Sequence, residues 1–435
     1  MKQALKYLFG VRLPHAISAI REPNNKVMRL FIYEGIIITL INNMVGSHNN
    51  LYAIRLGAGD YELGLATMIP QLVGMAVLIP GGILTDNLKS KRDMVTSALF
   101  MVACVYVLIG FVPALGSYRL GAFLVLLSIS SAPMTLYNVS WQAYFSDVIH
   151  PNGRNRVLAI RSSLSFLMGI TITLTAGALL SSASTNADKI RLHQMFLWAA
   201  ALLLLIQIIV LRRIPSKPLE QRSKFKLSVL KKAFTELIHN RRFLGFIGVA
   251  IFFYMTWHID WTLYFIGQTQ YLGMNESWLS YVNIGGAIVQ FLTMGIWSRI
   301  NSKHGVRLAI IFGSLGLSLC PIGMIIATSI DIANAKLIFL IMHTLFHITL
   351  ATTTLNILQC LLQVIPENNK TLNISIYTTL VMLSNGLMPF VGVYIYRMLG
   401  ANLKALQLVF AIIFVLRLIA SGLWALRWWM LRKEP

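Results

Sequence analysis

Acidic side chains within apolar sequence are the first candidates for chemistry in this chain. Glu34 and Asp260 each lie in a long apolar stretch, where an ionised carboxylate is costly. Such a carboxylate is suited to taking up and releasing a proton, and equally to a structural ion pair with a basic group. Asp260 also lies among Trp257, Trp261 and Tyr264, and aromatic faces beside one acid favour a cationic or amphipathic organic solute. We therefore predict proton coupling at Asp260 and Glu34, with structural ion pairing as the alternative for both.

Polar and aromatic side chains recur at helical spacing in the first, fourth, seventh and tenth apolar stretches. Polar groups are costly inside lipid, so such stripes tend to face a cavity or a neighbouring helix. The predicted substrate cavity is lined by Asn42, Asn43, Asn138, Gln142, Trp257, His258, Trp261, Tyr264, His347 and Thr354. The alternative is that small and hydroxyl residues serve only to join helices. His343 and His347, four residues apart, are candidates for a proton relay, and we expect no metal or other cofactor.

The elements that must carry these residues are apolar helices. Of the 435 residues, 56% are hydrophobic and 12% are charged, whereas soluble domains carry about 25% charged residues. A helix needs about 20 apolar residues to cross a bilayer, and backbone in lipid must satisfy its own hydrogen bonds. The sequence therefore predicts an all-α, polytopic membrane protein with twelve transmembrane helices. The predicted spans are 30–54, 62–83, 94–114, 120–145, 156–181, 192–211, 243–271, 277–299, 306–328, 335–363, 371–397 and 403–428.

The net charge of +22 is explained by the positions of the basic residues, so we expect no nucleic-acid partner. With twelve spans, 29 lysines and arginines lie on the side of both termini and 7 on the opposite side. Basic residues collect in cytoplasmic segments, so both termini are predicted to be cytoplasmic. We expect a multi-pass protein of a bacterial cell membrane. The three cysteines all lie within predicted spans, which indicates free thiols.

A single long polar stretch divides the spans into two sets of six. The predicted organisation is an N-terminal cytoplasmic segment 1–29, a six-helix bundle 30–211, a cytoplasmic linker 212–242, a second six-helix bundle 243–428 and a tail 429–435. Apolar residues at helical spacing among the linker's lysines predict an amphipathic helix on the membrane surface, with a solvated linker helix as the alternative. The halves resemble each other: Leu56 and Gly57 precede an acid, as Leu272 and Gly273 do 216 residues later. Two pseudo-symmetric bundles with a substrate site between them are therefore predicted.

The loop between the second and third predicted spans resembles a motif of the major facilitator superfamily. Gly82, Asp86, Lys91 and Arg92 stand where the family has a glycine, an acid and two basic residues. The resemblance implies the fold of that family, in which the first, fourth, seventh and tenth spans line a central cavity. It also implies that Asp86 holds a cytoplasmic gate shut against the start of the eleventh span, where a helix dipole favours a carboxylate.

The loop departs from the family pattern in places. Asn87 stands where a basic residue is usual, and Lys89 where a glycine is usual. In the second half, Arg299 replaces the acid, which predicts a gate that depends mainly on the first half. Two more basic residues have predicted roles: Arg161 pairs with Asp147 or another acid near the inner surface, and Arg417 is a peripheral anchor or extends to the interface.

The resemblance implies a secondary active transporter that moves a small organic solute by alternating access, with protons as the expected coupling ion. One alternative is an exporter of amphipathic or cationic compounds, although the fourth span lacks a central arginine and the fifth lacks a Gly-Pro pair. A second alternative is a non-transporting receptor or assembly factor on the same scaffold. An enzyme is disfavoured because the sequence has no HExxH, paired-carboxylate or Ser/His/Asp pattern. The expected partners are a small-molecule substrate, the lipid bilayer and protons, and the protein is expected to be a monomer.

Overall fold

The computed structural model describes the whole chain except residues 1–25, 88–89, 217–234, 236–238, 365–369 and 432–435. Within the described ranges every regular element is a helix. Eleven helical stretches there are long and apolar enough to cross a membrane, and one of them, Lys91–Val148, joins two of the predicted spans end to end. The prediction of a twelve-helix, all-α membrane protein is therefore confirmed. The predicted ends of each span lie within about six residues of the ends of the observed helices.

The chain divides into two compact units, at Met1–Phe225 and Lys226–Pro435. Most of the predicted amphipathic linker helix falls on residues 217–234 and 236–238, outside the described residues, so it stays a prediction.

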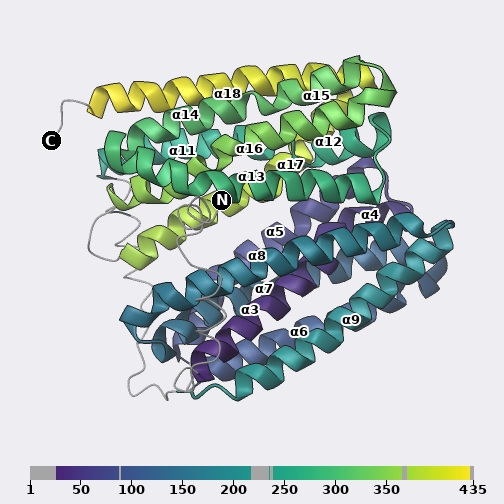
Figure 1. The fold of residues 1–435 in the computed structure, drawn as a ribbon, viewed down its shortest axis with the longest axis vertical. Helices are drawn as coiled ribbons and strands as arrows, with labels where there is room; N and C mark the ends of the chain where they lie inside the picture. Colours follow the sequence, from purple (N-terminus) through teal and green to yellow (C-terminus); the bar gives the residue numbers. More distant parts are fainter. Residues whose placement is uncertain (1–25, 88–89, 217–234, 236–238, 365–369, 432–435) are drawn as a thin grey trace, which may run out of the picture. The chain divides into compact units, whose positions relative to one another are not determined.

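Unit 1 contains the first six spans, coloured purple to teal in Figure 1. Its helices are α3 (Lys26–Met44), η2 (Gly46–His48), α4 (Asn49–Arg55), α5 (Asp60–Asn87), α6 (Lys91–Phe111), η3 (Val112–Tyr118), α7 (Arg119–Val148), α8 (Pro151–Ser182) and α9 (Asn186–Arg212). The helix α6 packs against α7 and α9, while α3 packs against α8 and α9. Local sequence determines where several helices begin. The side chains of Ser90 and Thr185 accept hydrogen bonds from the backbone N–H groups three residues later, at the starts of α6 and α9, and Pro151 is the first residue of α8.

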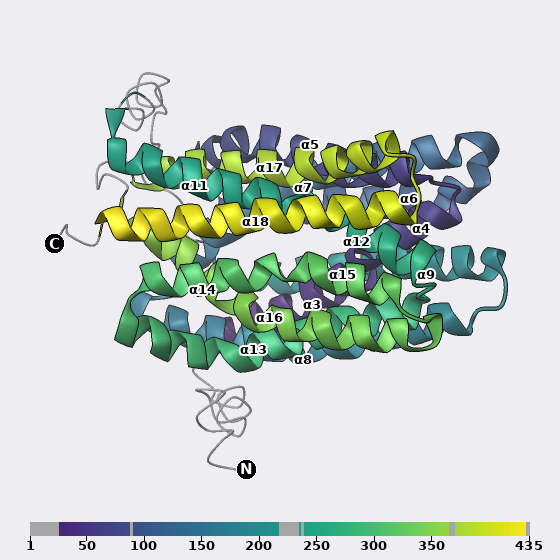
Figure 2. The same cartoon turned by 90° about the horizontal axis from the view of Figure 1, so that it is seen from above.

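Unit 2 contains the last six spans, coloured green to yellow. Its helices are α11 (Arg241–His258), α12 (Trp261–Ile266), the π-helix η4 (Gly267–Tyr271), α13 (Glu276–His304), α14 (Val306–Ser318), α15 (Cys320–Ser329), α16 (Ile332–Leu362), α17 (Lys370–Met398) and α18 (Leu403–Leu431). Figure 2 shows α18 with α11 on one side and α14 and α15 on the other, all of which it contacts. The inner residues of this bundle are mainly aromatic and aliphatic, with Phe246, Phe253 and Trp424 among them.

The first span of each unit is interrupted at a matching place. In unit 1, α3 ends at Met44 and a short 3-10 turn leads into α4. In unit 2, α11 ends at His258 and α12 begins at Trp261. At the offset of 216 residues predicted from the sequence, Met44 corresponds to Asp260, which lies between α11 and α12. Discontinuous helices at equivalent points of two repeats mark the substrate and ion sites of many secondary transporters.

Candidate functional site

Asp260 occupies the helix break of unit 2 and forms a buried ion pair with Arg417 of α18. Nη2 of Arg417 donates to both carboxylate oxygens of Asp260, at 2.8 and 2.7 Å. The carboxylate is fully buried and the arginine is 3% exposed. The expectation that Arg417 is a peripheral anchor is therefore wrong. Its long side chain runs into the bundle, where Asp260 and free backbone carbonyls accept the hydrogen bonds of the guanidinium. Lipid tails offer no such acceptors.

The same arginine stabilises the break itself. Nε of Arg417 donates to the carbonyl of Thr256 and Nη2 to that of Trp257, both at 3.0 Å. In a continuous α-helix these two carbonyls would accept the N–H groups of Asp260 and Trp261. Nη1 donates to the carbonyl of Leu317 near the end of α14, at 3.0 Å. Arg417 thus replaces helical hydrogen bonds and ties α14 and α18 to the break, which is a known way for a helix interruption to persist in lipid.

The backbone at the break lies directly against α17. A Cβ added at Gly392 would overlap the carbonyl oxygen of Ile259, so only glycine lets α17 come this close. Next to this contact, Nδ1 of His258 lies 3.2 Å from Oγ of Ser384, also on α17. The interruption is therefore held from two sides, by α17 packing and by Arg417 of α18.

Aromatic side chains surround the break. The rings of Trp257 and Trp261 pack edge to face at 6.1 Å, and His258 lies 4.6 Å from Trp261. His258 is buried, whereas Trp261 is 40% exposed and presents an indole at the surface of the unit. The four predicted residues Trp257, His258, Asp260 and Trp261 thus form one cluster. An indole beside a buried polar group can stack on a sugar ring, a nucleobase or a cation.

A second aromatic series leads from the break towards α16. Tyr264 of α12 packs against His343, whose ring lies 4.2 Å from that of His347. Nδ1 of His347 lies 2.7 Å from the backbone carbonyl of His343, and both histidines are half-buried. The structure therefore brings the three residues together, while their roles as cavity and relay residues stay predictions. Thr354 lies in α16, but its side chain is outside what the structure describes.

Glu34 is the corresponding buried acid of unit 1, and it is held by four donors. Oε1 accepts from the hydroxyl of Tyr137 and from Nε2 of Gln207, the latter at 2.9 Å. Oε2 accepts from Nε1 of Trp141 at 3.0 Å and from Nη2 of Arg161 at 3.2 Å. The donors come from α7, α8 and α9, so the carboxylate joins α3 to three other helices.

The partner of Arg161 is therefore Glu34, while Asp147 pairs with Lys91 at 2.7 Å. The guanidinium also lies 4.3 Å above the ring of Trp141. Gly35 leaves room for this side chain, since a Cβ there would overlap it. An acid two turns inside an apolar helix indicates that it has polar partners. The sequence does not identify them, because they lie on three helices that are distant along the chain.

The remaining predicted cavity residues of unit 1 divide into two kinds. Asn42 of α3 and Asn138 and Gln142 of α7 are exposed, although they lie well inside spans. Asn43 instead faces α8, where its Oδ1 accepts from Thr173 at 3.1 Å. Asn43 therefore joins two helices, which is the alternative role predicted from the sequence. For the other three, exposure within a span favours contact with water over lipid.

The loop motif places basic side chains at the end of unit 1 where α9 ends. Gly82 and Asp86 lie in the last turns of α5, and the side chain of Asp86 is outside the described part of the chain. The predicted gate at Asp86 therefore stays a prediction. Lys91 joins α6 to α7 through Asp147. Arg299, the second-half counterpart of the acid, is exposed on α13.

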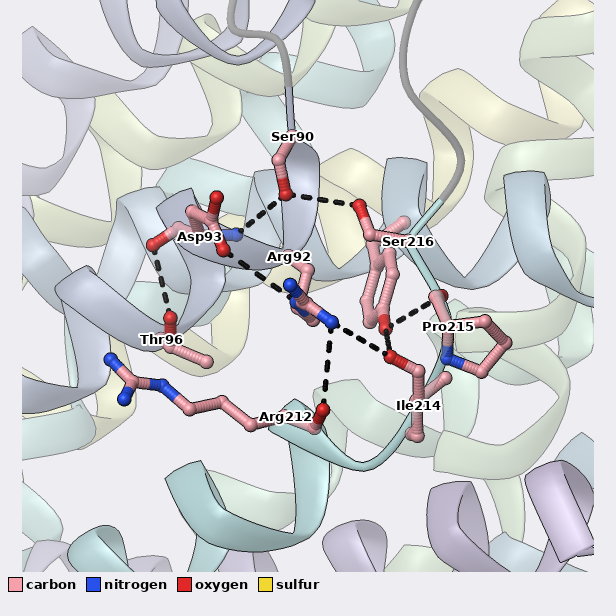
Figure 3. Close-up of polar contacts among 9 residues, drawn as sticks. Ser90, Arg92, Asp93, Thr96, Arg212, Ile214, Pro215 and Ser216 are labelled. Atoms are coloured by element: carbon pink, nitrogen blue, oxygen red, sulfur yellow. Dashed lines mark hydrogen bonds and ion pairs between the residues drawn. The ribbon is translucent and has the colours of Figure 1, made fainter.

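Arg92 holds the chain that leaves α9, as Figure 3 shows. Its Nη1 donates to the carbonyls of Arg212 and Ile214, at 3.5 and 3.3 Å. The hydroxyl of Tyr144 donates to the carbonyls of Ile214 and Pro215, each at 3.2 Å. Oγ of Ser90 lies 3.0 Å from Oγ of Ser216. The start of the predicted linker is thus fixed to the beginning of α6 and the end of α7, a contact that the motif did not reveal.

The fold and these buried pairs define a polytopic α-helical membrane protein with interrupted first helices in both halves. The family model of the Major Facilitator Superfamily matches residues 31–380, and the chain belongs to this family. The resemblance inferred from the loop motif is therefore confirmed. No curated protein sequence matches the chain.

Solved structures of transporters share the fold. A bacterial homologue of the iron transporter ferroportin has 10% identity and a TM-score of 0.70, with 93% of this chain and 99% of that chain covered. The nucleoside transporter NupG has 14% identity and a TM-score of 0.67, with 93% and 99% covered. The xylose transporter XylE from E. coli has 15% identity and a TM-score of 0.61, with 94% and 97% covered. At these identities the likeness is one of fold.

Proposed function

We propose that the protein is a secondary active transporter that moves a small organic solute across the membrane by alternating access, driven by protons. The observation that carries the proposal is the pair of matching interruptions, after Met44 in unit 1 and around Asp260 in unit 2. A helix broken inside the bilayer exposes backbone polar groups, and this is tolerated where the break is buried in protein or lines a site. Membership of a family of transporters supports the same reading.

Exposed polar side chains within spans give independent support. Asn42, Asn138 and Gln142 would each be costly against lipid tails, so we propose that they line a water-filled path for the solute. Trp261, with its exposed indole beside the break, is the proposed stacking surface for the solute. A non-transporting scaffold has no need of exposed amides inside its spans, which disfavours the receptor alternative.

Asp260 is the better candidate for the coupling carboxylate. Four donors from three other helices bind the carboxylate of Glu34, so any change at this group disturbs contacts throughout unit 1. One nitrogen atom, Nη2 of Arg417, binds both oxygens of Asp260, so protonation of Asp260 disturbs fewer contacts. We therefore propose that Asp260 exchanges a proton during transport and that Glu34 mainly holds unit 1 together.

Substrate class and orientation complete the proposal. The proposed solute is a polar ring compound such as a sugar or nucleoside, the substrate types named for the xylose and nucleoside transporters of the same fold. Export of an amphipathic cation is the second candidate, favoured by the acid and the aromatic rings around it. The distribution of Lys and Arg supports cytoplasmic termini in a bacterial cell membrane. We propose a monomer without enzymatic activity.

The direct test is uptake by proteoliposomes. Purified protein is reconstituted, a pH gradient is imposed, and entry of labelled D-xylose, uridine and an aromatic cation is followed with and without a protonophore. The proposal predicts gradient-driven accumulation of one class, and predicts that Asp260→Asn abolishes accumulation while solute exchange continues. Asp331→Asn, which makes the same change at an exposed acid of unit 2, serves as the matched control. Accumulation by Asp260→Asn equal to that of the wild type would exclude Asp260 as the coupling group.

A further inference from the structure

Asn385 of α17 carries a buried acceptor in the part of unit 2 that holds the helix break. Its side-chain oxygen Oδ1 is covered by surrounding atoms, and no donor among the residues that the structure describes bonds to it. Leaving a buried amide oxygen without a donor is costly, and buried polar side chains are nearly always hydrogen-bonded. The position of Asn385 therefore needs an explanation other than stability.

Pro389 leaves a second acceptor on the same residue. It lies inside α17, four residues after Asn385. Because proline has no backbone N–H, the carbonyl of Asn385 lacks the donor that a continuous helix would supply. Within a membrane span such a carbonyl is satisfied by a neighbouring helix, a hydroxyl group or water. Asn385 thus offers two acceptor oxygens, one on its side chain and one on its backbone.

The packing of α17 turns this residue towards the break. The helix α17 contacts both α11 and α12, which lie on the two sides of the break (Figure 2). Gly392, whose added Cβ would overlap the carbonyl oxygen of Ile259, lies seven residues after Asn385 and so on the same face of the helix. The exposed side chains of Leu383 and Leu387 lie two residues before and after Asn385, on the opposite face. The side chain of Asn385 therefore lies on the face of α17 that borders the break.

Ser384 connects Asn385 to the aromatic cluster of the break. Oγ of Ser384 lies 3.2 Å from Nδ1 of His258. The ring of His258 stacks on that of Trp257 at 5.6 Å and packs edge to face against Trp261 at 4.6 Å. Asn385 is half-buried as a whole, and the terminal torsion of an asparagine side chain is broadly variable. A turn about this torsion presents Oδ1 to a solute that stacks on the exposed indole of Trp261.

We propose that Asn385 is a specificity-determining residue, which accepts hydrogen bonds from two adjacent hydroxyl groups of the solute at Oδ1 and at its own carbonyl. This inference rests on the proposed function and names the part of the solute that the site selects, a vicinal diol such as that of a pentose or of the ribose of a nucleoside. Two acceptors on one residue match two donors on neighbouring carbon atoms. Such a site rejects an analogue that lacks one hydroxyl group, because a buried acceptor is then left without a donor.

Equilibrium binding to the purified full-length chain, without a proton gradient, tests the proposal. Uridine is compared with 2′-deoxyuridine and 3′-deoxyuridine, D-xylose with 2-deoxy-D-xylose, and an aromatic cation is the third ligand. We expect at least one diol to bind at least about tenfold more tightly than a deoxy form of it. In Asn385→Leu, which keeps the size of the side chain but removes the acceptor, that preference should fall to less than about threefold. Thr378→Val removes a different polar group of α17, one that bonds within its own helix, and should bind like the wild type.

The melting temperature of the protein without solute is an independent readout. Asn385→Leu removes a buried acceptor that has no donor among the described residues, so it should melt about 1–4 °C higher than the wild type. Asn356→Leu is the matched control, because Asn356 is a buried asparagine of α16 that bonds to Asn301 and Thr352. This control should melt lower than the wild type, since its partners lose their hydrogen bonds. A fall in melting temperature for both variants would show that Asn385 has a structural role and would overturn the proposal.

The binding and uptake results separate this proposal from the proposed function. Equal binding of diol and deoxy forms by a wild-type protein that accumulates either solute would overturn the role of Asn385 alone. Selective binding of a diol without gradient-driven uptake would contradict proton-driven transport and leave the role of Asn385 intact. Binding of the aromatic cation alone, binding of no ligand, or an unchanged preference in Asn385→Leu would each overturn the diol proposal. If Asn385→Leu is not monodisperse, Asn385→Ala decides by the same titration.

Discussion

Arg417 of α18 binds both carboxylate oxygens of Asp260 and, with the same guanidinium, the carbonyls of Thr256 and Trp257. The ion pair and the interruption of the seventh span are therefore one structural unit. Replacing Arg417 would remove the charge that pairs with Asp260 and also the donors that replace the helical hydrogen bonds of Thr256 and Trp257. A proton on Asp260 would weaken the hold of Arg417 on the break, which gives a physical route from protonation to a change of helix geometry.

Arg417→Gln should destabilise the protein strongly. Breaking a buried ion pair leaves an uncompensated charge on Asp260 and typically costs about 3–5 kcal/mol. The melting temperature in detergent measures the effect. Asp260→Asn/Arg417→Gln should recover part of the loss, because it removes the isolated charge but not the need of Thr256 and Trp257 for donors. A single variant as stable as the wild type would show that the pair has no structural role.

Gly392→Ala should lower stability by about 1–3 kcal/mol, since the added Cβ overlaps the carbonyl of Ile259 and forces α17 away from the break. Gly422→Ala is the matched control, as its Cβ would meet no atom within 4 Å. The control should be neutral or slightly stabilising, because alanine favours a helix more than glycine does. Equal melting temperatures for the two variants would contradict the close approach of α17.

Glu34→Gln should cost about 1–3 kcal/mol and leave the coupling of transport to protons intact. The carboxylate of Glu34 accepts four hydrogen bonds, whereas the NH₂ group of a glutamine amide is itself a donor. At least one of Tyr137, Trp141 or Gln207 therefore loses its acceptor. Thermal unfolding and the pH dependence of uptake are measured together. Loss of proton coupling in a variant of normal stability would move the coupling role from Asp260 to Glu34.

Arg92→Gln should release the segment that follows α9. The carbonyls of Arg212 and Ile214 lose a cationic donor, and the long, partly exposed bonds indicate a contribution of about 0.5–1.5 kcal/mol. Hydrogen exchange of residues 212–216 should become faster by roughly threefold to tenfold, while exchange at the start of α9 stays unchanged. Arg191→Gln, at that distant start, is the control. Unchanged exchange at 212–216 would show that Tyr144 and Ser90 alone hold the segment.

The sequence was sufficient for the fold but only for part of the site. Apolar length and basic-residue positions predict spans well because lipid imposes both, and the repeat predicted equivalent positions that the structure then showed as matching interruptions. Asp260 and Glu34 stood out because acids are rare in spans. Their partners could not be assigned, since Arg417 and Arg161 lie 157 and 127 residues away along the chain and only packing brings them together. Arg417 itself was the available signal: an arginine in an apolar span needs a buried partner.

Alternating access is tested most directly by labelling one residue from both sides of the membrane. Asn138→Cys is made in a chain whose three cysteines are replaced by alanine, and a membrane-impermeant maleimide is applied to intact cells and to inside-out vesicles. The control retains only native Cys104, which is exposed on α6 beside Phe100, Met101 and Leu108, a face suited to lipid. We predict that the cysteine at position 138 reacts from both sides and that Cys104 reacts from neither. Reaction of position 138 from one side only, or from neither, would contradict a path that opens alternately to the two sides.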